Sequence, residues 1–387
     1  MYKLIRITTV PISLKILLRG QLRFMNGQNF DVLGVSSVGE ELDEIRVDEG
    51  ISVHALNMTR KISPLKDLKS LWKFYRLCKK EKPDIVHSHT PKAGIIGMFG
   101  ARLAGVPIRL HTVAGMPLME AKGTKRRILD WVEKITYAFA TKVYPNSMGL
   151  HDFILHNGYV SKDKLKIIGN GSSNGINTEF FSRAQIESHK MQSLKLSLGI
   201  KDRDFIFIFV GRLVGDKGIN ELISAFKQSK LPDVKLLLVG APETFDPLSE
   251  VILNEIHINP NIIAVGFQRD VRPYFAISDA LVFPSYREGF PNVVMQAGAM
   301  ELPAIVSDIN GCNEIIIEGK NGTIIPVKNV DAIKEAMEIM VRDRERYFQM
   351  KANARKMITE RYEQQVVWDA LLTEYKSLLK ERGLDNV

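Results

Sequence analysis

The chain has 387 residues, of which 45% are hydrophobic and 25% are charged, and its net charge is +9. Because one hydrophobic core rarely grows beyond roughly 250 to 300 residues, this length predicts two domains. Two cysteines are too few for a disulfide framework or a zinc cluster and fit a reducing compartment. The sequence also lacks an apolar run of about 20 residues and a signal-peptide pattern, so we expect a cytoplasmic protein.

The first half of the chain alternates apolar strands with helical patterns. Strands are predicted at residues 4–8, 31–36, 51–56, 84–89, 108–113, 142–146 and 165–169, and helices at 65–81, 93–104 and 124–141. Strands and helices that alternate with short connections predict a doubly wound parallel sheet. The polar segment 170–177, NGSSNGIN, then favours a link between domains.

A second alternating series follows a charged helix at residues 185–198. Its strands are predicted at 205–210, 234–239, 262–265, 280–283, 304–307 and 323–325. The fold class is therefore α/β, with two Rossmann-like domains. We predict an N-terminal domain at 1–180, a C-terminal domain at 181–363, and a final helix at 364–387. The apolar stripe of that helix is predicted to pack back on the first domain.

The stretch 286–303, YREGFPNVVMQAGAMELP, follows the predicted strand at 280–283. It places Glu288 and Gly289 just before a helix predicted at 292–300. A parallel strand that runs into a helix N-terminus is a common position for anion binding, because the free N–H groups there carry partial positive charge. We therefore expect an anionic ligand beside a carboxylate.

The stretch 205–218, FIFIFVGRLVGDKG, offers cations in an equivalent place. Arg212 and Lys217 follow a buried strand, and Gly211 and Gly218 allow close approach of the backbone. A planar guanidinium and an ammonium suit phosphate oxygens, so the pattern favours a diphosphate site. The alternative is that both residues merely cap a surface loop.

Taken together, GRLVGDKG and REGFPNVVMQAGAMELP, behind a first domain with a strand-end histidine, resemble the retaining GT-B glycosyltransferases of family 4. The resemblance implies transfer of a sugar from a nucleotide diphosphate donor, with no metal or other cofactor. It implies that Arg212 and Lys217 neutralise the diphosphate, that Glu288 binds the transferred sugar, and that His111 contacts this sugar.

The same resemblance implies further donor-binding positions, namely Gly211, Gly289, Phe290, Pro291, Asn292, Val293 and Gln296. Family members carry a second carboxylate at the last of these positions, where it clasps the ribose. Gln296 can still accept and donate hydrogen bonds, but it loses the charge-assisted bond of a carboxylate, a difference of about 1 kcal/mol.

Residues suited to the acceptor lie in the first domain, namely Lys15, Arg19, His89, Lys92, Asn146 and Asn174. The segment after the first strand, TTVPISLKILLRGQ, lacks the glycine pair of many family members. Lys15 and Arg19 could instead meet an acceptor diphosphate, as in relatives that extend a sugar on a polyprenyl diphosphate. His87 and His89 lack a third zinc ligand with suitable spacing, so we favour polar lining of a cleft.

Two basic amphipathic segments, 14–24 and 122–131, have a composition suited to an anionic membrane surface. A solvated helix face or a basic acceptor pocket is the alternative for each. The aromatic pattern of an RNA-binding sheet is absent, so we expect no nucleic-acid partner. Peripheral attachment to the inner face of the plasma membrane is therefore an expectation from composition.

The leading hypothesis is a retaining glycosyltransferase that uses a nucleotide sugar, most simply a UDP-sugar, to build a bacterial surface polysaccharide or a lipid-linked glycan. Asp202 and Asp204 precede a strand at the edge opposite the ligand site, so they do not form a metal-binding DxD loop. A nucleotide-sugar 2-epimerase and a non-catalytic sugar-binding module remain alternatives. A dinucleotide oxidoreductase would need a GxGxxG motif, which neither domain supplies.

Overall fold

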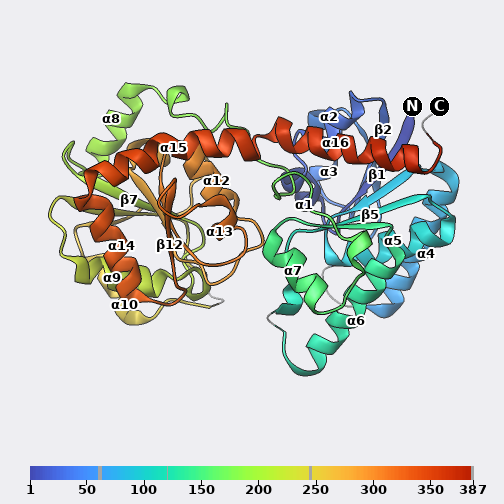
Figure 1. Cartoon of the computed structure of the whole chain (residues 1–387), viewed down its shortest axis with the longest axis horizontal. Coiled ribbons are helices and arrows are strands. Elements are labelled where there is room, and N and C mark those ends of the chain that lie inside the picture. The colour runs from blue at the N-terminus through green and yellow to red at the C-terminus, as the bar shows by residue number, and fades with distance from the viewer. Residues whose placement is uncertain (60–62, 120, 244–245, 385–387) are drawn as a thin grey trace. The chain divides into compact units, whose positions relative to one another are not determined.

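The computed structural model describes residues 1–59, 63–119, 121–243 and 246–384. The chain forms two compact units (Figure 1). Unit 1 comprises residues 1–174 and 365–387, and unit 2 comprises residues 175–364. The point where the chain leaves unit 1 lies inside the polar segment 170–177.

Unit 1 is built on a six-stranded parallel sheet in the order β3-β2-β1-β4-β5-β6. Its strands are β1 Tyr2–Ile7, β2 Phe30–Ser36, β3 Ser52–Ala55, β4 Ile85–Ser88, β5 Ile108–Val113 and β6 Lys142–Pro145. Six predicted strands are thus confirmed, and the prediction for 108–113 has the same bounds as β5. The apolar residues of β1, β4 and β5 are buried because helices cover both faces of the sheet.

The seventh strand predicted for unit 1, at 165–169, is wrong. Among the described residues, only an isolated bridge between Val143 and Leu165 extends the sheet there. A short 3₁₀ helix, η2 Lys162–Lys164, precedes this bridge, and Gly169 adopts the left-handed conformation with φ of +56°. A left-handed residue turns the chain away from an extended path, so apolar composition alone misled the prediction.

The helices of unit 1 are α1 Pro11–Leu17, α2 Gln21–Asn26, α3 Glu41–Glu49, α4 Pro64–Glu81, α5 Pro91–Ala104, η1 Pro117–Met119, α6 Gly123–Phe139 and α7 Met148–His156. The helices α1, α4 and α5 begin with proline, whose missing N–H costs nothing in the first turn. The structure corrects the first membrane-suited segment, 14–24, because Leu14, Leu18 and Leu22 are fully buried in the core.

The final helix, α16 Gln364–Glu381, packs against the sheet of unit 1 as predicted from its apolar stripe. Leu371, Tyr375 and Leu379 are buried in one hydrophobic cluster with residues of β1 and β2. The ring of Phe30 meets that of Tyr375 edge-on at 5.8 Å. The last helix in the sequence therefore completes the core of the first unit.

Unit 2 repeats the same topology with a second six-stranded parallel sheet, in the order β12-β11-β10-β7-β8-β9. Its strands are β7 Phe205–Val210, β8 Val234–Val239, β9 Ile262–Ala264, β10 Ala280–Phe283, β11 Ala304–Ser307 and β12 Gly322–Ile325. Four of them, β7, β8, β10 and β11, have the predicted bounds. Two Rossmann-like sheets are therefore confirmed.

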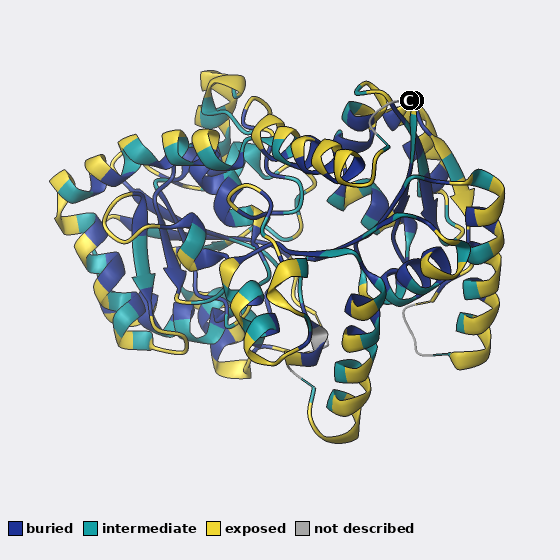
Figure 2. Cartoon of the chain, turned by 45° about the vertical axis from the view of Figure 1, so that its right-hand side comes forward, coloured by how far each residue is buried: buried dark blue, intermediate teal, exposed yellow. Residues whose placement is uncertain are grey.

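The helices of unit 2 are η3 Arg183–Gln185, α8 Ser188–Ser197, η4 Gly215–Lys217, α9 Ile219–Ser229, α10 Glu250–Ile258, α11 Arg272–Ile277, α12 Asn292–Ala299, α13 Cys312–Ile315, α14 Val330–Arg342 and α15 Arg344–Tyr362. Figure 2 shows buried strands inside each unit and exposed residues on the outer sides of the helices. No helix among the described residues is both long and apolar enough to cross a membrane.

Candidate functional site

The carboxyl ends of β7 and β10 lie side by side in the sheet of unit 2. The loop after β7 and the loop after β10 therefore share one edge of the sheet, as predicted. Gly218 makes their close contact possible, because it has φ of +71° and a Cβ there would lie 2.1 Å from the carbonyl oxygen of Pro284. Any side chain at residue 218 would push the two loops apart.

Lys217 and Glu288 meet across this contact. The Lys217 ammonium forms an ion pair with the Glu288 carboxylate, and their side chains are only 15% and 18% exposed. The Ser285 hydroxyl donates to the same carboxylate oxygen at 3.0 Å, and Lys217 Nζ lies 5.8 Å from the ring centroid of Phe283. The structure thus joins a cation and an acid that the sequence separates by 71 residues.

Arg212 occupies the same loop but has a different partner. Its guanidinium is half exposed and forms an ion pair with Glu243 at 2.9 Å. Among the described residues, no hydrogen bond or ion pair joins Arg212 to Lys217 or Glu288. Sequence reasoning missed Glu243, because it lies in an irregular loop after β8 and no motif marks it.

The N-terminus of α12 is held by contacts on both sides. On one side, the rings of Phe290 and Tyr362 pack with their centroids 5.3 Å apart. On the other side, Gly311 has φ of +72°, and a Cβ at this residue would lie only 2.8 Å from the carbonyl oxygen of Gly289. The helix begins at Asn292, so it confirms the predicted helix start. Sequence reasoning missed Gly311, although a glycine directly before a short helix was a visible signal.

Asn292 is exposed in the first turn of α12, and Gln296 is half-buried one turn later. Residues four positions apart lie on the same face of a helix, so Asn292 and Gln296 share one face near the N-terminus of α12. Gly289, Pro291 and Val293 supply the backbone that leads into this turn. Apart from Gly211, which directly follows β7, the predicted donor-binding residues therefore lie at the N-terminus of α12, close in sequence to Glu288.

A second polar cluster lies inside unit 1, where Arg6 of β1 is fully buried. Its guanidinium donates to His89 Nε2 at 3.0 Å, to the Tyr375 hydroxyl at 3.2 Å, and to the Gln21 amide oxygen. The Tyr375 hydroxyl also bonds His87 Nδ1 at 2.6 Å. No sequence signal joins these residues, because Arg6 and Tyr375 are 369 positions apart.

His89 and Asn146 line a small cavity beside this cluster, together with Ser173. Because His89 Nε2 accepts from Arg6, its Nδ1 carries the hydrogen in the neutral ring. His89 Nδ1, Asn146 Oδ1 and Ser173 Oγ are buried without a hydrogen-bond partner among the described residues. The cavity therefore offers both a donor and an acceptor to a small hydroxyl group.

The other predicted acceptor residues lie in different surroundings. Asn174 accepts from Trp368 Nε1 at 2.7 Å and from Gln21 Nε2 at 3.1 Å, so it borders the buried cluster. Lys15 forms an ion pair with Glu44, and Lys92 forms one with Asp67 at 2.7 Å. Arg19 is exposed, and its carbonyl accepts from Asn174 Nδ2 at 3.0 Å. The structure therefore gathers Asn174, His89 and Asn146, and it places Lys15 and Lys92 in separate ion pairs.

His111 lies within β5, where we expected it at the strand end, and its ring is buried. Its Nδ1 lies 2.8 Å from the Ser88 hydroxyl, and a Cβ at Gly94 would approach its Cε1 to 2.6 Å. Burial lowers the pKa of His111 to about 4. The ring is therefore neutral at pH 7.

Burial also holds the pKa of His87 and of His89 well below the ordinary value, with the Arg6 charge adding to the effect. The unfolded chain binds protons at these histidines below pH about 6.5, whereas the folded chain does not, so stability must fall as the pH drops. If all three buried histidines stay neutral, the free energy of unfolding should fall by about 4 kcal/mol per pH unit below that point.

Urea unfolding at pH 7, 6 and 5 tests this expectation. In the variant His111→Asn, the free energy of unfolding should depend less steeply on pH, because the unfolded chain then has one fewer of the three histidines that bind a proton only on unfolding. The matched control is His189→Gln, since this ring is largely exposed, and it should keep the full slope. A free energy of unfolding that stays constant from pH 7 to pH 5 would contradict the prediction.

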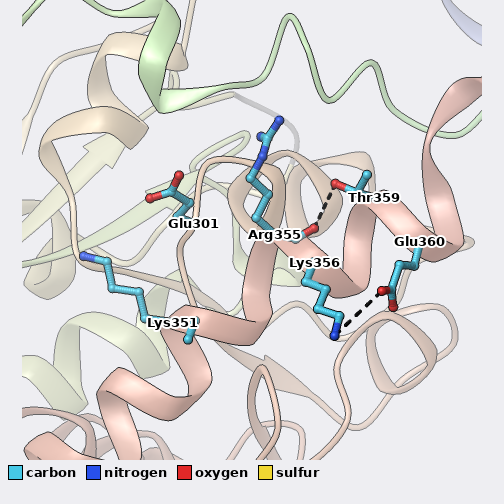
Figure 3. Close-up of a pocket in the computed structure, with 7 residues that line it drawn as sticks. Glu301, Lys351, Arg355, Lys356, Thr359 and Glu360 are labelled. Carbon is cyan, nitrogen blue, oxygen red and sulfur yellow. Dashed lines mark hydrogen bonds and ion pairs between the residues drawn. The ribbon is translucent and has the colours of Figure 1, made fainter.

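Possible metal ligands and pockets away from these clusters are the remaining candidates for a functional site. No group of three or more His, Cys, Asp or Glu side chains within the described ranges is arranged to hold a metal ion. A shallow pocket on the outer side of α15 is lined by Lys351, Arg355 and Glu360 (Figure 3). Arg355 is engaged there, because it donates to the carbonyl oxygens of Phe181 and Thr178, each at 2.9 Å.

Comparison with known proteins identifies the family. Residues 191–357 match the model of "Glycosyl transferases group 1", and residues 26–171 match that of the "Glycosyl transferase 4-like domain". The chain is 37% identical over 381 residues to the capsular polysaccharide biosynthesis glycosyltransferase CapM of Staphylococcus aureus, covering 98% of both chains.

A second relative is the Escherichia coli UDP-Gal:alpha-D-GlcNAc-diphosphoundecaprenol alpha-1,3-galactosyltransferase. It is 30% identical over 325 residues, which cover 82% of this chain and 81% of the relative. The crystal structure of Anabaena HepE in complex with UDP has the same fold, with a TM-score of 0.82 at 17% identity over 97% of this chain and all of that one. The chain therefore belongs to the group 1, GT-B family of glycosyltransferases.

Proposed function

We propose that this glycosyltransferase moves a hexosyl or N-acetylhexosaminyl group from a UDP-sugar to a lipid-linked saccharide, with retention of configuration and without a metal ion. The Lys217–Glu288 pair at the mouth of α12 is the observation that carries the proposal. The E. coli relative is named for a UDP-Gal donor and a diphosphoundecaprenol-linked acceptor, which supports this choice of substrates. CapM supports a role in surface polysaccharide synthesis.

In the proposed reaction, the bond between the sugar C1 and the β-phosphate oxygen breaks as the acceptor oxygen bonds to C1 on the same face. The acceptor hydroxyl gives its proton to the departing diphosphate. Lys217 and Arg212 stabilise the negative charge that develops on this diphosphate, together with the N–H groups at the start of α12. Glu288 accepts hydrogen bonds from the hydroxyls of the transferred sugar.

Lys217 and Glu288 neutralise each other in the structure. Donor binding would give each of them a second partner, a phosphate for the lysine and a sugar hydroxyl for the glutamate. The pair would therefore be oriented before the donor arrives, so that little reorganisation is needed during the reaction. We propose further that His111 contacts the donor sugar as a neutral ring.

For the acceptor, we propose that unit 1 supplies His89, Asn146 and Asn174. The buried donor and acceptor atoms around the cavity lined by His89 and Asn146 support this assignment, and Asn174 is hydrogen-bonded to Gln21, which lines the same cavity. We propose that Lys15, Arg19 and Lys92 contribute positive charge for an acceptor diphosphate. Because such an acceptor is held in a membrane, we also propose that the enzyme associates peripherally with the inner face of the plasma membrane.

The test is a panel of nucleotide sugars with a GlcNAc-diphospho-lipid acceptor, assayed with and without EDTA. We expect one UDP-sugar to support transfer, with product anomers that retain the donor configuration, and no loss of rate in EDTA. A rate that EDTA abolishes and Mg²⁺ restores would overturn the metal-free proposal. Inverted product would overturn the proposed stereochemistry.

The sugar C2 hydrogen separates this proposal from the 2-epimerase alternative. In deuterated water, a transferase leaves the C2 hydrogen of the donor in place, whereas a 2-epimerase exchanges it with solvent. The relatives reported above are named as glycosyltransferases, which supports transfer over epimerisation. Exchange at C2 would overturn our assignment.

The variant Gln296→Glu tests the ribose contact. A carboxylate at residue 296 restores a charge-assisted bond to the ribose hydroxyls, so UDP should bind about fivefold more tightly, a gain of about 1 kcal/mol. Isothermal titration with UDP measures this change, and Gln296→Met is the matched control that removes hydrogen bonding. A large loss of affinity in Gln296→Glu would show that the site is built around the amide.

A further inference from the structure

We propose that α4 and α6 of unit 1 form a docking face for an anionic lipid bilayer. The proposal rests on the peripheral membrane association proposed above, and it does not depend on the donor or the chemistry. The apolar members of this docking face are Leu65, Leu68, Trp72, Ile128 and Trp131, and its basic members are Lys66, Lys69, Lys73, Arg76, Lys125, Arg127 and Lys134.

The two helices belong to one layer. α5 packs against α4 on one side and against α6 on the other, so the three helices cover the same face of the sheet (Figure 1). Each follows a strand of the parallel sheet, so the N-terminal halves of α4 and α6 lie at the carboxyl edge of that sheet. The cavity lined by His89 and Asn146 lies at this same edge.

The exposed side of α4 carries large apolar side chains at helical spacing. Leu65 is 86% exposed, Leu68 is 64% exposed, and Trp72 is 60% exposed. The basic residues Lys69 and Lys73 follow the same helical spacing beside them. The opposite side of the helix is buried against the sheet, so these three apolar residues have no place in the core.

The exposed side of α6 has the same character. Trp131 is 67% exposed and Ile128 is 45% exposed, one turn apart on the helix. Lys125 and Arg127 flank them at the N-terminal end, and Lys134 follows one turn later. Figure 2 shows exposed residues along the outer sides of both helices. Tryptophan and lysine side chains on one helix face suit a membrane interface.

The carboxylates of the two helices are either paired with a base or buried. In α4, Asp67 is paired with Lys92, and Glu81 is paired with Lys3, each at 2.7 Å. In α6, Asp130 bonds Arg126 at 2.8 Å. The remaining acid, Glu133, is buried, and its burial raises the pKa to about 7.

The exposed bases, by contrast, are not neutralised by neighbouring carboxylates of the described residues. Within the described ranges, Lys69, Lys73, Lys125 and Arg127 form no ion pair. A face that combines exposed tryptophans with uncompensated positive charge complements an anionic lipid surface, where bases gain from the headgroups and apolar rings enter the interface. A protein partner would instead need acidic residues placed opposite these bases and a surface shaped to fit the tryptophans. The observed combination of charge and apolar rings therefore favours the lipid surface.

Vesicle binding tests the proposal with the purified full chain. We expect co-sedimentation with vesicles of phosphatidylglycerol and phosphatidylcholine, weaker binding at high salt, and little binding to phosphatidylcholine alone. Two of the three tryptophans lie on the docking face, so their emission should shift to shorter wavelength with the anionic vesicles. This shift should shrink in Trp72→Phe and again in Trp131→Phe.

The fourfold variant Lys69→Glu, Lys73→Glu, Lys125→Glu and Arg127→Glu should lose binding. Each base near the surface contributes about fivefold to partitioning, so the four reversals should reduce it by more than about 100-fold. The matched control reverses the exposed bases Lys201, Lys230, Lys320 and Lys376, which lie elsewhere on the chain. This control changes the net charge equally and should still bind.

Equal loss in the two variants would overturn the proposal, because net charge alone would then explain binding. The proposal would also be overturned if the wild-type protein did not bind anionic vesicles, or if it bound neutral vesicles equally well. Hydrolysis of the UDP-sugar donor without vesicles should be the same in the wild-type protein and in both variants. If donor hydrolysis is absent in all three, the proposed chemistry fails while the docking result still stands.

Discussion

Replacing Lys217 by alanine is expected to lower the rate of sugar transfer by about 10²- to 10³-fold, because the departing diphosphate loses a partly buried cation. The same range is expected for Glu288→Ala, which removes the carboxylate proposed to hold the transferred sugar. The two side chains form one ion pair, so the double variant should be little worse than either single variant. Initial rates of transfer to a lipid-linked acceptor give all three values.

The matched controls come from the same unit. Lys227 of α9 forms an ion pair with Glu255 of α10 at 2.6 Å, away from the carboxyl edge of the sheet. Lys227→Ala and Glu255→Ala should leave transfer almost unchanged. Thermal unfolding checks that each variant is folded. Near-normal transfer by Lys217→Ala or Glu288→Ala would remove that residue from its proposed role.

The variant Tyr375→Phe is expected to lower the free energy of unfolding of unit 1 by about 3 kcal/mol. The Tyr375 hydroxyl accepts from Arg6 and bonds His87, and all three groups are buried. Removing it leaves a buried guanidinium and a buried imidazole each without one hydrogen bond. The loss of hydrogen bonds to a buried charge is the larger part of the expected cost.

Urea unfolding at pH 7 measures this cost. Tyr75→Phe is the control, because its ring is only partly buried on α4 and it makes the same change in size. The control should stay within about 0.5 kcal/mol of the wild-type protein. A loss below about 1 kcal/mol in Tyr375→Phe would show that other groups replace the hydroxyl, since one neutral hydrogen bond contributes about that much.

Much of the fold could be predicted from local patterns. Strands such as β7 and β8 are runs of mostly apolar residues that are buried on both faces of the sheet. Their predicted bounds agree with the bounds in the structure. The failure at 165–169 has a local cause as well. The left-handed Gly169 limits pairing to Leu165, and apolar composition says nothing about backbone direction.

The site was predictable in part. The motifs around Lys217 and Glu288 marked the two loops, but their direct ion pair and the Ser285 contact depend on how β7 and β10 are placed in the sheet. The segment 14–24 shows the opposite error. Its composition predicted a membrane face, whereas Leu14, Leu18 and Leu22 are buried in the core of unit 1. Composition alone cannot distinguish a core-facing stripe from a membrane-facing stripe.

The sequence by itself determined the two Rossmann-like sheets, the family, and the residues at the mouth of α12, because periodicity and short motifs are local properties of the chain. Only the tertiary structure decided which distant groups share a site. Arg6 and Tyr375 meet because the last helix returns to the first sheet, and Gly218 allows Lys217 to reach Glu288. Such contacts depend on the packing of whole elements, which no local pattern encodes.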